Sequence, residues 1–501
     1  MTEQSGGEVE QTREFTVQFQ RLIRRMLEDL PDDSGGDALE PVLTEHLGVP
    51  SAGLPVVSEP VPHHRAVDAD LALEAVAGDD AHARVIGLSG DMRHHLTLGD
   101  ILQHGPRGPV RVGQVDYDRL DTGPAADQVR QVITSGIWLL RFEGRPAAVR
   151  VQGSAPQYGR QEGRLEVLAP DRDAADALVT RLRELMDELS VLRGKVVTLV
   201  DEPFGHGFAG ITFVPRPDVD ASAVVLPDGL LDRVVHHVVG MGEHRSRLRD
   251  AGQHLKRGVL LYGPPGTGKT HTIRHLLART PGTTAVLLAG GSLRHIHAAA
   301  SIARAHQPAI VVLEDCDLVA EDRSFGMGPS PLLFEVLDTL DGLDADADVA
   351  FLLTTNRVED LEVALAQRPG RVDLAAEIPL PDAEGRLALL RLYGGHLFSA
   401  EAMSTATART EGTTASFTKE LVRRAVLAAA IADEPPADDH LGIALDELLS
   451  DGERLTRSLL GVDPGAGDDA EPGPAPFPPA GRPRRGGFHA YAPGGGAAYR
   501  G

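Results

Sequence analysis

The stretch Gly263-Pro264-Pro265-Gly266-Thr267-Gly268-Lys269-Thr270 decides the fold of the central part of this chain. It matches G-x-x-x-x-G-K-[ST], a phosphate-binding loop that joins a β-strand to an α-helix. An apolar run at 259–262 precedes the loop and a helix-compatible stretch at 273–278 follows it. A glycine-rich turn with a chance lysine is the alternative, and the complete pattern in its full context disfavours it. We therefore expect a parallel α/β sheet that binds a nucleoside triphosphate.

Each residue type in this loop has a physical task. Successive backbone N–H groups can point at one phosphate, and the N-terminus of the following helix adds its positive end. We expect the lysine to bridge the β- and γ-phosphates and the threonine hydroxyl to bind Mg²⁺. The predicted nucleotide-binding residues here are Gly263, Pro264, Pro265, Gly266, Thr267, Gly268, Lys269, Thr270 and His271.

Polar side chains at three later points are suited to act on a bound triphosphate. Glu314 and Asp315 end one apolar run, where carboxylates can face Mg²⁺ and an attacking water. Asn356 ends the next apolar run and could orient that water. Arg368 and Arg371 follow a helix-like segment and could reach the γ-phosphate of a neighbouring subunit. These five residues are the predicted catalytic set.

This order of motifs resembles that of the AAA family of ring-forming ATPases over about residues 225–460. The resemblance implies a P-loop core with a helical lid, ATP and Mg²⁺ as cofactors, and hydrolysis of the β–γ phosphoanhydride bond. It also implies these roles: Lys269 and Thr270 as Walker A, Glu314 and Asp315 as Walker B, Thr270 and Glu314 as metal ligands, Asn356 as sensor 1, and Arg368 and Arg371 as arginine fingers.

Two further segments are similar to nucleotide-contacting parts of the family. Val239 and Gly240 resemble the segment that members lay against adenine, which favours ATP over GTP. The stretch 411–416 resembles the sensor 2 region, although it departs from the usual Gly-Ala pair.

The Walker B acids depart from the usual family order. Most members read Asp-Glu, whereas Glu314-Asp315 places the shorter carboxylate on the catalytic side. The same order is similar to that of the mitochondrial Rieske-protein translocase branch, as is the entry Lys256-Arg257-Gly258 before the loop. A lost catalytic acid replaced by a structural pair is the alternative, because a small misplacement can be costly in rate.

The excess of arginine over lysine is typical of a GC-rich bacterial proteome.

The segment expected to face a ring pore contains no aromatic residue. Threading members of the family carry one on the loop after the second strand, but 289–307 has no Phe, Tyr or Trp. An unfoldase that grips its client with an aromatic paddle is therefore disfavoured.

Composition bounds the class of protein. The 501 residues are 42% hydrophobic, enough for two or three cores, and the net charge of −24 disfavours nucleic acid as a partner. The polar start and the absence of a membrane-length apolar run predict no signal peptide, no membrane association and a cytoplasmic location. The only cysteine, Cys316, excludes an internal disulfide framework.

The chain is predicted to have five parts. These are an amphipathic helix and linker at 1–65, an α+β domain at 66–222 that could bind a partner, the ATPase core at 223–380, a helical lid at 381–461, and a disordered Pro/Gly-rich tail at 462–501. In the α+β domain we expect strands at 110–115, 137–142, 148–152, 165–168, 196–200 and 211–214 and a helix at 173–189. An apolar stripe at 12–30 could pack on the chain itself or contact a partner.

Two functions remain open at this point. The first is an ATPase that forms a homo-oligomeric ring, a hexamer, and remodels an unidentified protein client. The second is an ATP-switched assembly scaffold with slow hydrolysis that performs no mechanical work. They differ in whether a client changes ATP turnover.

Overall fold

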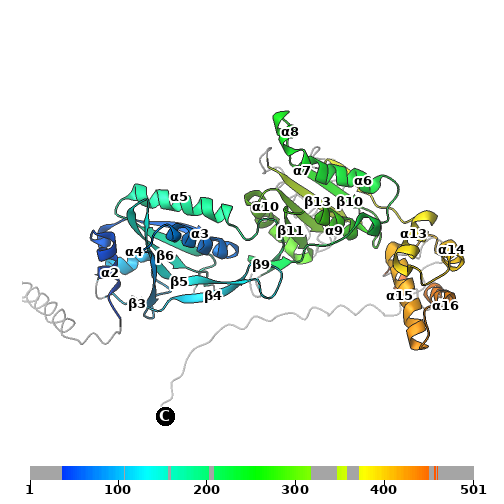
Figure 1. Cartoon of the computed structure of the whole chain (residues 1–501), viewed down its shortest axis with the longest axis horizontal. Coiled ribbons are helices and arrows are strands. Elements are labelled where there is room, and N and C mark those ends of the chain that lie inside the picture. Colours follow the sequence, from blue (N-terminus) through cyan, green and yellow to red (C-terminus); the bar gives the residue numbers. More distant parts are fainter. Residues whose placement is uncertain are drawn as a thin grey trace, which may run out of the picture. The chain divides into compact units, whose positions relative to one another are not determined.

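Two seven-stranded sheets and a group of helices make up the described part of the chain (Figure 1). The structure, a computed structural model, describes residues 36–105, 108–155, 159–201, 208–316, 347–357, 372–450, 456–457 and 460. The predicted helix at 12–30 and the predicted tail at 462–501 lie outside these residues. The predicted fold class, an α/β P-loop core with a helical region and an α+β domain before it, is confirmed.

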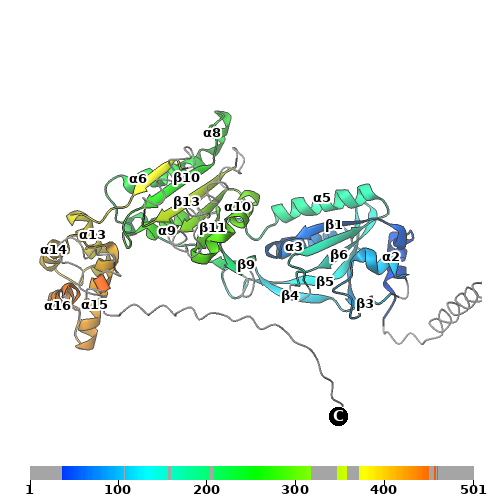
Figure 2. The ribbon, with the colours of Figure 1, turned by 180° about the vertical axis from the view of Figure 1, so that it is seen from behind.

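The first sheet is antiparallel, with the order β1-β7-β6-β5-β2-β3 and β4 paired to β5. Its strands are β1 (Val56–Val61), β2 (Arg84–Ser89), β3 (Arg111–Gly113), β4 (Asp116–Asp121), β5 (Val129–Phe142), β6 (Arg145–Gln152) and β7 (Gly163–Leu168). Helices α3 (Ala66–Gly78) and α5 (Arg172–Glu188) cover one face (Figure 2), and α2 (Leu39–Leu47) and α4 (Leu98–Gln103) pack on the other. We call this unit the first-sheet domain.

Strand alternation explains why helices cover both faces of the first sheet. Successive strand residues point to opposite sides, so Leu140 packs with α3 and α5 while its neighbour Leu139 packs with α2 and α4. Inside the domain, Glu166 accepts hydrogen bonds from Leu98 N at 3.0 Å and from Arg150 Nη1 at 3.1 Å. Both members of this ion pair are 1% exposed, so the start of α4 is fixed to the sheet by a buried charge pair.

The second sheet has the order β14-β10-β13-β12-β11-β8-β9, and all its pairs are parallel except β8 with β9. Its strands are β8 (Val196–Asp201), β9 (Phe208–Val214), β10 (Arg257–Tyr262), β11 (Thr284–Ala289), β12 (Ala309–Glu314), β13 (Val349–Thr355) and β14 (Leu374–Glu377). Helices α6 (Leu230–Val235) and α9 (Lys269–Arg279) cover one face, and α10 (Ile296–Ala305) covers the other. The central strands are therefore buried on both sides, as in other parallel sheets.

Two expected strands belong to a different sheet from the one predicted. We placed 196–200 and 211–214 in the domain at 66–222, but the structure pairs β8 with β11 and so extends the second sheet. The reason is visible in β8, where Val196 packs with α9 and Val197 packs with α10. At the other end, α2 and β1 place the start of the first-sheet domain before residue 66. The sheets thus divide the chain at points other than the predicted boundaries.

Among the described residues, four helices follow the second sheet and form their own core. They are α13 (Ala383–Gly394), α14 (Ala400–Arg409), α15 (Ala415–Ile431) and α16 (Asp438–Leu449), packed around Phe417, Leu421 and Leu445. The side chains of Asp382, Ser399 and Thr414 cap α13, α14 and α15. We call this unit the lid; the helix α14 was not predicted from the sequence.

A buried polar network joins α3 of the first-sheet domain to α10 of the second sheet. Asp68 accepts hydrogen bonds from Val191 N at 3.0 Å and from Arg65 Nε at 3.1 Å. Beside it, the ring of His306 at the end of α10 lies 2.8 Å from Ser190 Oγ through Nε2. Burial and the nearby charges of Arg65, His306 and His63 lower the pKa of His64 to about 4.

We predict that the buried histidine beside this network makes the free energy of unfolding fall on acidification. Below pH 6.5 the unfolded chain protonates His64 while the folded chain does not, so stability falls as the pH drops from about 6.5 to about 4. A shift of this size corresponds to about 3 kcal/mol. Burial also lowers the pKa of His306, which acts in the same direction, and raises the pKa of Asp68, which opposes it.

The measurement is the free energy of unfolding between pH 7.5 and 4.5 in the wild type and in His64→Gln. The glutamine variant cannot take up a proton, so its stability should fall less steeply with acid. If the free energy of unfolding depends on pH equally in the two proteins, the low pKa of His64 does not cause the loss of stability.

Candidate functional site

The phosphate-binding loop lies between β10 and α9 in a conformation that depends on its glycines. Gly263, Gly266 and Gly268 have φ values of 141°, 76° and 112°, a region that other residues rarely adopt. A side chain at Gly263 would also place its Cβ 2.2 Å from the Ile378 carbonyl oxygen. The loop is therefore a backbone cradle at the N-terminus of α9, as anion binding requires.

Lys269 is held inside this loop. Its side chain donates hydrogen bonds to Gly263 O at 2.7 Å and to Pro264 O at 2.8 Å, and only 6% of the residue is exposed. Thr267 Oγ1 donates to the same Pro264 carbonyl at 2.9 Å. The lysine ammonium and the first turn of α9 thus converge on one place where a phosphate can bind.

The side chains of Thr270 and Glu314 meet beside the loop. Glu314 is the last residue of β12, and the Thr270 hydroxyl at the start of α9 hydrogen-bonds to it. Burial raises the pKa of Glu314, the neighbouring Asp315 raises it further, and Arg274 and Thr270 lower it. A carboxylate and a hydroxyl next to a phosphate cradle are oxygen donors of the kind that Mg²⁺ prefers. The residues present therefore fit the predicted metal ion.

Asp315 and Asn356 come together because β12 and β13 are parallel neighbours in the sheet. Asn356 Nδ2 lies 3.5 Å from Asp315 Oδ1, and the backbone N–H of Asp315 donates to Thr354 Oγ1 at 2.9 Å. Asp315 has a φ of 52°, in the left-handed region that aspartate tolerates better than most residues. Such backbone conformations occur at functional sites. Sequence reasoning missed Thr354, whose only signal was its place in Thr354-Thr355-Asn356.

The structure also brings the predicted sensor 2 region to the loop. Ser416 N, at the start of α15, donates a hydrogen bond to Gly266 O at 3.1 Å. A Cβ at Gly266 would lie 2.9 Å from Ser416 Oγ. The lid therefore touches the phosphate-binding loop even without the Gly-Ala pair of the family.

Other predicted nucleotide contacts differ in what the structure says of them. Val239 is buried in the core with Ile273, and Gly240 is the last residue of the helical turn His236–Gly240. Their contact with adenine stays a prediction. Burial lowers the pKa of His271, and its hydrogen bond to the backbone of Ala223 opposes this. His271 thus contacts the chain segment before α6, and its contact with nucleotide stays a prediction.

The two predicted arginine fingers, Arg368 and Arg371, lie outside the described residues. The same holds for the chain between Cys316 and Ala347. The roles of these residues therefore stay predictions. The other predicted catalytic residues, Glu314, Asp315 and Asn356, lie at the carboxyl edge of the second sheet.

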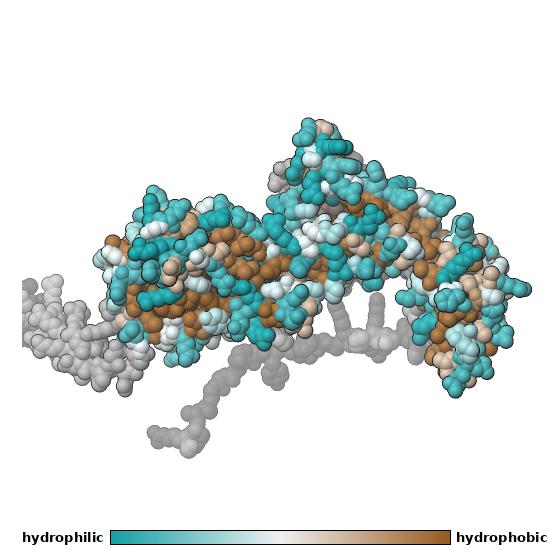
Figure 3. Space-filling view, in the orientation of Figure 1, coloured by the Kyte–Doolittle hydropathy of each residue, from teal (hydrophilic) through white to brown (hydrophobic). Residues whose placement is uncertain are grey.

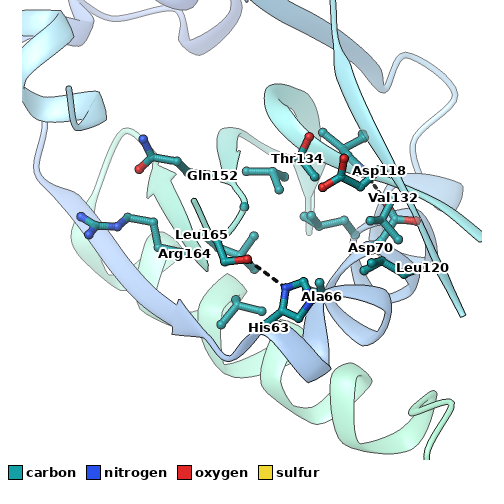
Figure 4. A pocket seen from close by; sticks show the side chains of 17 residues that line it. His63, Ala66, Asp70, Asp118, Leu120, Val132, Thr134, Gln152, Arg164 and Leu165 are labelled. Carbon is teal, nitrogen blue, oxygen red and sulfur yellow. Dashed lines mark hydrogen bonds between the residues drawn. The ribbon is translucent and has the colours of Figure 1, made fainter. Parts of the chain in front are cut away.

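The first-sheet domain contains a cavity that is far smaller than the usual ligand site (Figure 4). Its volume is about 40 Å³, whereas ligand pockets span several hundred Å³. Around it, His63 Nδ1 lies 2.9 Å from Ser154 Oγ, and Asp70 accepts a hydrogen bond from Arg130 at 2.8 Å. These polar groups hydrogen-bond to one another.

The described residues contain no group of three or more His, Cys, Asp or Glu side chains arranged to hold a metal ion, so His271 and His275 are not part of such a cluster. Across the same residues, no helix combines the length and the apolar character needed to span a bilayer.

Comparison with known proteins agrees with the geometry of the second sheet. A family model described as "ATPase family associated with various cellular activities (AAA)" matches residues 259–380. The 26S proteasome regulatory subunit 8 homolog of Schizosaccharomyces pombe is 33% identical over 165 residues, which are 30% of this chain and 41% of that protein. The proteasome-activating nucleotidase of Methanospirillum hungatei is 35% identical over 150 residues, 27% of this chain and 36% of that protein.

A third relative matches over a longer stretch at lower identity. The ATP-dependent zinc metalloprotease FtsH 1 of Thermomicrobium roseum is 25% identical over 381 residues, 70% of this chain and 57% of that protein. The chain thus spans less than two thirds of the length of each of these relatives. A metalloprotease motif H-E-x-x-H is absent from the sequence of this chain.

The family model matches residues that lie in the second sheet and directly after it. These matches neither confirm nor contradict the bacterial origin and the resemblance to the Rieske-protein translocase branch, which stay predictions. The predicted ATPase class is confirmed for the domain that carries the phosphate-binding loop. Residues 259–380 of this chain are an ATPase domain of the AAA family.

Proposed function

We propose that this protein hydrolyses ATP at the interfaces of a homo-oligomeric ring and uses the cycle to remodel a protein client. One observation carries the hydrolytic part of the proposal. Thr270, Glu314, Asp315 and Asn356 meet at the carboxyl edge of the second sheet, directly beside the glycine loop. An edge of this kind is where open α/β sheets bind their ligands.

Some residues of the proposed site would bind ATP and the metal ion, and others would take part in hydrolysis. ATP supplies the phosphoanhydride bond, and Mg²⁺ neutralises part of the phosphate charge. Lys269 and the loop N–H groups would hold the phosphates, and Thr270 and Glu314 would hold the metal ion. Asp315 would accept the proton of an attacking water, and Asn356 would orient that water.

The ring and the client are supported by likeness and by surface chemistry. The relatives include proteins named as proteasome subunits and as a proteasome-activating nucleotidase. Leu427, Ile431 and Ile443 of the lid are 48%, 79% and 51% exposed, and the lid shows hydrophobic areas in the space-filling view (Figure 3). Exposed apolar areas of this kind favour contact with another protein surface. A cytoplasmic hexamer is the form that we propose.

The scaffold hypothesis makes a different claim about turnover. If the protein remodels a client, ATP hydrolysis should rise when the client is present; if it is a scaffold, turnover should stay slow and constant. We would isolate the client by capture on an Asp315→Asn variant with ATP bound, and then measure hydrolysis by the wild type with and without it. A captured protein that leaves turnover unchanged favours the scaffold.

We predict that two inactive variants restore activity to each other. Arg368→Ala keeps an intact nucleotide pocket, and Lys269→Ala keeps intact arginines, so a mixed ring contains interfaces that pair the two. ATP hydrolysis by the mixture should exceed that of either variant alone. Mixing Lys269→Ala with Asp315→Asn is the matched control, because no interface then has a complete pocket. Mixed rings that form but stay inactive would contradict a site shared between subunits.

A further inference from the structure

The chain segment 215–225, which we call the strap, runs along the phosphate-loop helix α9. It joins β9 to the turn before α6 and contacts α9 at its end, its middle and its beginning. These contacts come from Arg216, from the backbone of Val219 and from the backbone of Ala223. The strap therefore follows nearly the whole length of the helix that carries Lys269 and Thr270.

Arg216 fixes the strap to the C-terminal end of α9. Its guanidinium donates to the carbonyls of Leu277 at 2.8 Å, Thr280 at 3.2 Å and Thr283 at 2.5 Å. It also donates to Gly194 O at 3.1 Å, just before β8. The last carbonyls of a helix lack partners within the helix and carry its negative end, so an arginine is suited to this place.

Two histidines on α9 fix the other points of the strap. His275 is 1% exposed, and its Nδ1 lies 2.8 Å from Val219 O, so this nitrogen carries the hydrogen. One turn earlier, His271 hydrogen-bonds to the backbone of Ala223. The (i, i+4) spacing puts both imidazoles on the same face of the helix, toward the strap. The structure thus explains a histidine pair that the ATPase motif itself does not require.

The two ends of the strap lead away from the nucleotide site. At one end, β9 pairs with β8, and Gly210 of β9 lies next to His63 of the first-sheet domain. At the other end, Val225 lies near Gly385 in the first turn of α13, where a Cβ on the glycine would be 3.9 Å from Val225 Cγ1. A contact at α9 is therefore connected to both the first-sheet domain and the lid.

The strap also closes a cavity beside the predicted metal site. Its Pro217, with Val214 of β9, lines a space of about 540 Å³ between α9, β8 and β11. Thr270 and Glu314 line the same space. A displacement of the strap would therefore change the surroundings of both predicted metal ligands.

We propose that the strap is a mechanical link through which nucleotide at the loop displaces β9, with Arg216 and His275 as its positioning residues. The inference rests on the proposed function, because it requires that the loop binds ATP. A helix moves as a rigid body, and hydrogen bonds at three points along α9 force the strap to move with it. Neither residue touches the nucleotide; each acts through the backbone that it holds.

The test is hydrogen–deuterium exchange of the full chain with and without a non-hydrolysable ATP analogue and Mg²⁺. Exchange reports local opening of backbone amides, and binding of the analogue is measured separately by calorimetry. In the wild type we expect the analogue to change exchange at 208–214 and 215–225. In Arg216→Gln, that difference should be lost at 208–214 while the affinity for the analogue is kept.

Two further comparisons separate linkage from folding. Arg193→Gln is the matched control, because Arg193 also donates to main-chain carbonyls, those of Asp187 and Gln307, but outside the strap. It should keep the nucleotide-induced difference. His275→Leu should abolish the nucleotide-induced difference, and His275→Gln, whose side chain can still donate a hydrogen bond, should keep it. These two variants test the link if Arg216→Gln fails to fold.

Two results would overturn the link. One is an analogue that binds the wild type but leaves exchange of the strap and β9 unchanged. The other is an unchanged nucleotide-induced difference in both Arg216→Gln and His275→Leu. A wild-type chain that does not bind the analogue at all would instead count against the proposed function. A purely structural role would raise exchange equally with and without nucleotide and leave the difference intact.

Discussion

Lys269→Ala should abolish ATP binding by the purified protein. The ammonium of Lys269 lies against the carbonyls of Gly263 and Pro264, at the start of α9, where the phosphates are expected to bind. Its removal takes away the side-chain cation of the loop and leaves the charge of the phosphates without its main partner. Equilibrium binding of ATP with Mg²⁺, measured by calorimetry, should show no detectable heat of binding.

Lys195→Ala is the matched control for this loss. Lys195 is one of the few other lysines and precedes β8, on the far side of β11 from the phosphate-binding loop. Its replacement removes the same charge and should leave ATP affinity unchanged. Equal affinity for ATP in the wild type and in Lys269→Ala would contradict the assignment of this loop to the nucleotide site.

The second large effect is expected at Asp315. Asp315→Asn should lower the rate of ATP hydrolysis by about 10²- to 10⁴-fold, the usual contribution of a general base, and keep the affinity for ATP. Asparagine has the same size and also tolerates the left-handed backbone, so the loss would come from the missing carboxylate. Steady-state turnover and the dissociation constant for ATP measure the two quantities separately.

Asp433→Asn controls for the backbone at Asp315. Asp433 also has a positive φ, 57°, and lies at the end of α15 rather than at the site. This variant should hydrolyse ATP at the wild-type rate. If Asp315→Asn does the same, the alternative of a structural acid pair gains support.

The sequence predicted the central site because its signals are local or ordered along parallel strands. A phosphate-binding loop can be found from its fixed glycine spacing alone. Acids or amides that end apolar runs must meet at one edge of a parallel sheet. Glu314, Asp315 and Asn356 were found in this way. The hydroxyl of Thr354, which accepts from Asp315, was missed, because a hydroxyl leaves no pattern in one sequence. The stretch that contains Ser416 was found only through its resemblance to the family.

The sheet to which a strand belongs was harder to predict than the strand itself. Alternation and apolar runs located β8 and β9, but nothing within 196–214 shows that β8 pairs with β11, which follows it by more than eighty residues. Short elements such as β1 and α14 were missed, since they bury few residues and carry weak periodicity. The hydrogen bond of His271 to the strap could not be foreseen from the sequence, and its predicted contact with nucleotide stays a prediction.

The Mg²⁺ dependence of ATP hydrolysis distinguishes the roles of Glu314 and Asp315, whose order is inverted relative to that of most AAA family members. Because burial and Asp315 raise the pKa of Glu314, the titration should be done on the alkaline side of neutrality, which favours the ionised form of Glu314. Glu314→Gln should require more Mg²⁺ for half-maximal turnover and regain activity as Mg²⁺ rises. Asp315→Asn should keep the wild-type Mg²⁺ midpoint with a lower maximal rate. The opposite pattern, with the midpoint shifted in Asp315→Asn and unchanged in Glu314→Gln, would contradict the assignment.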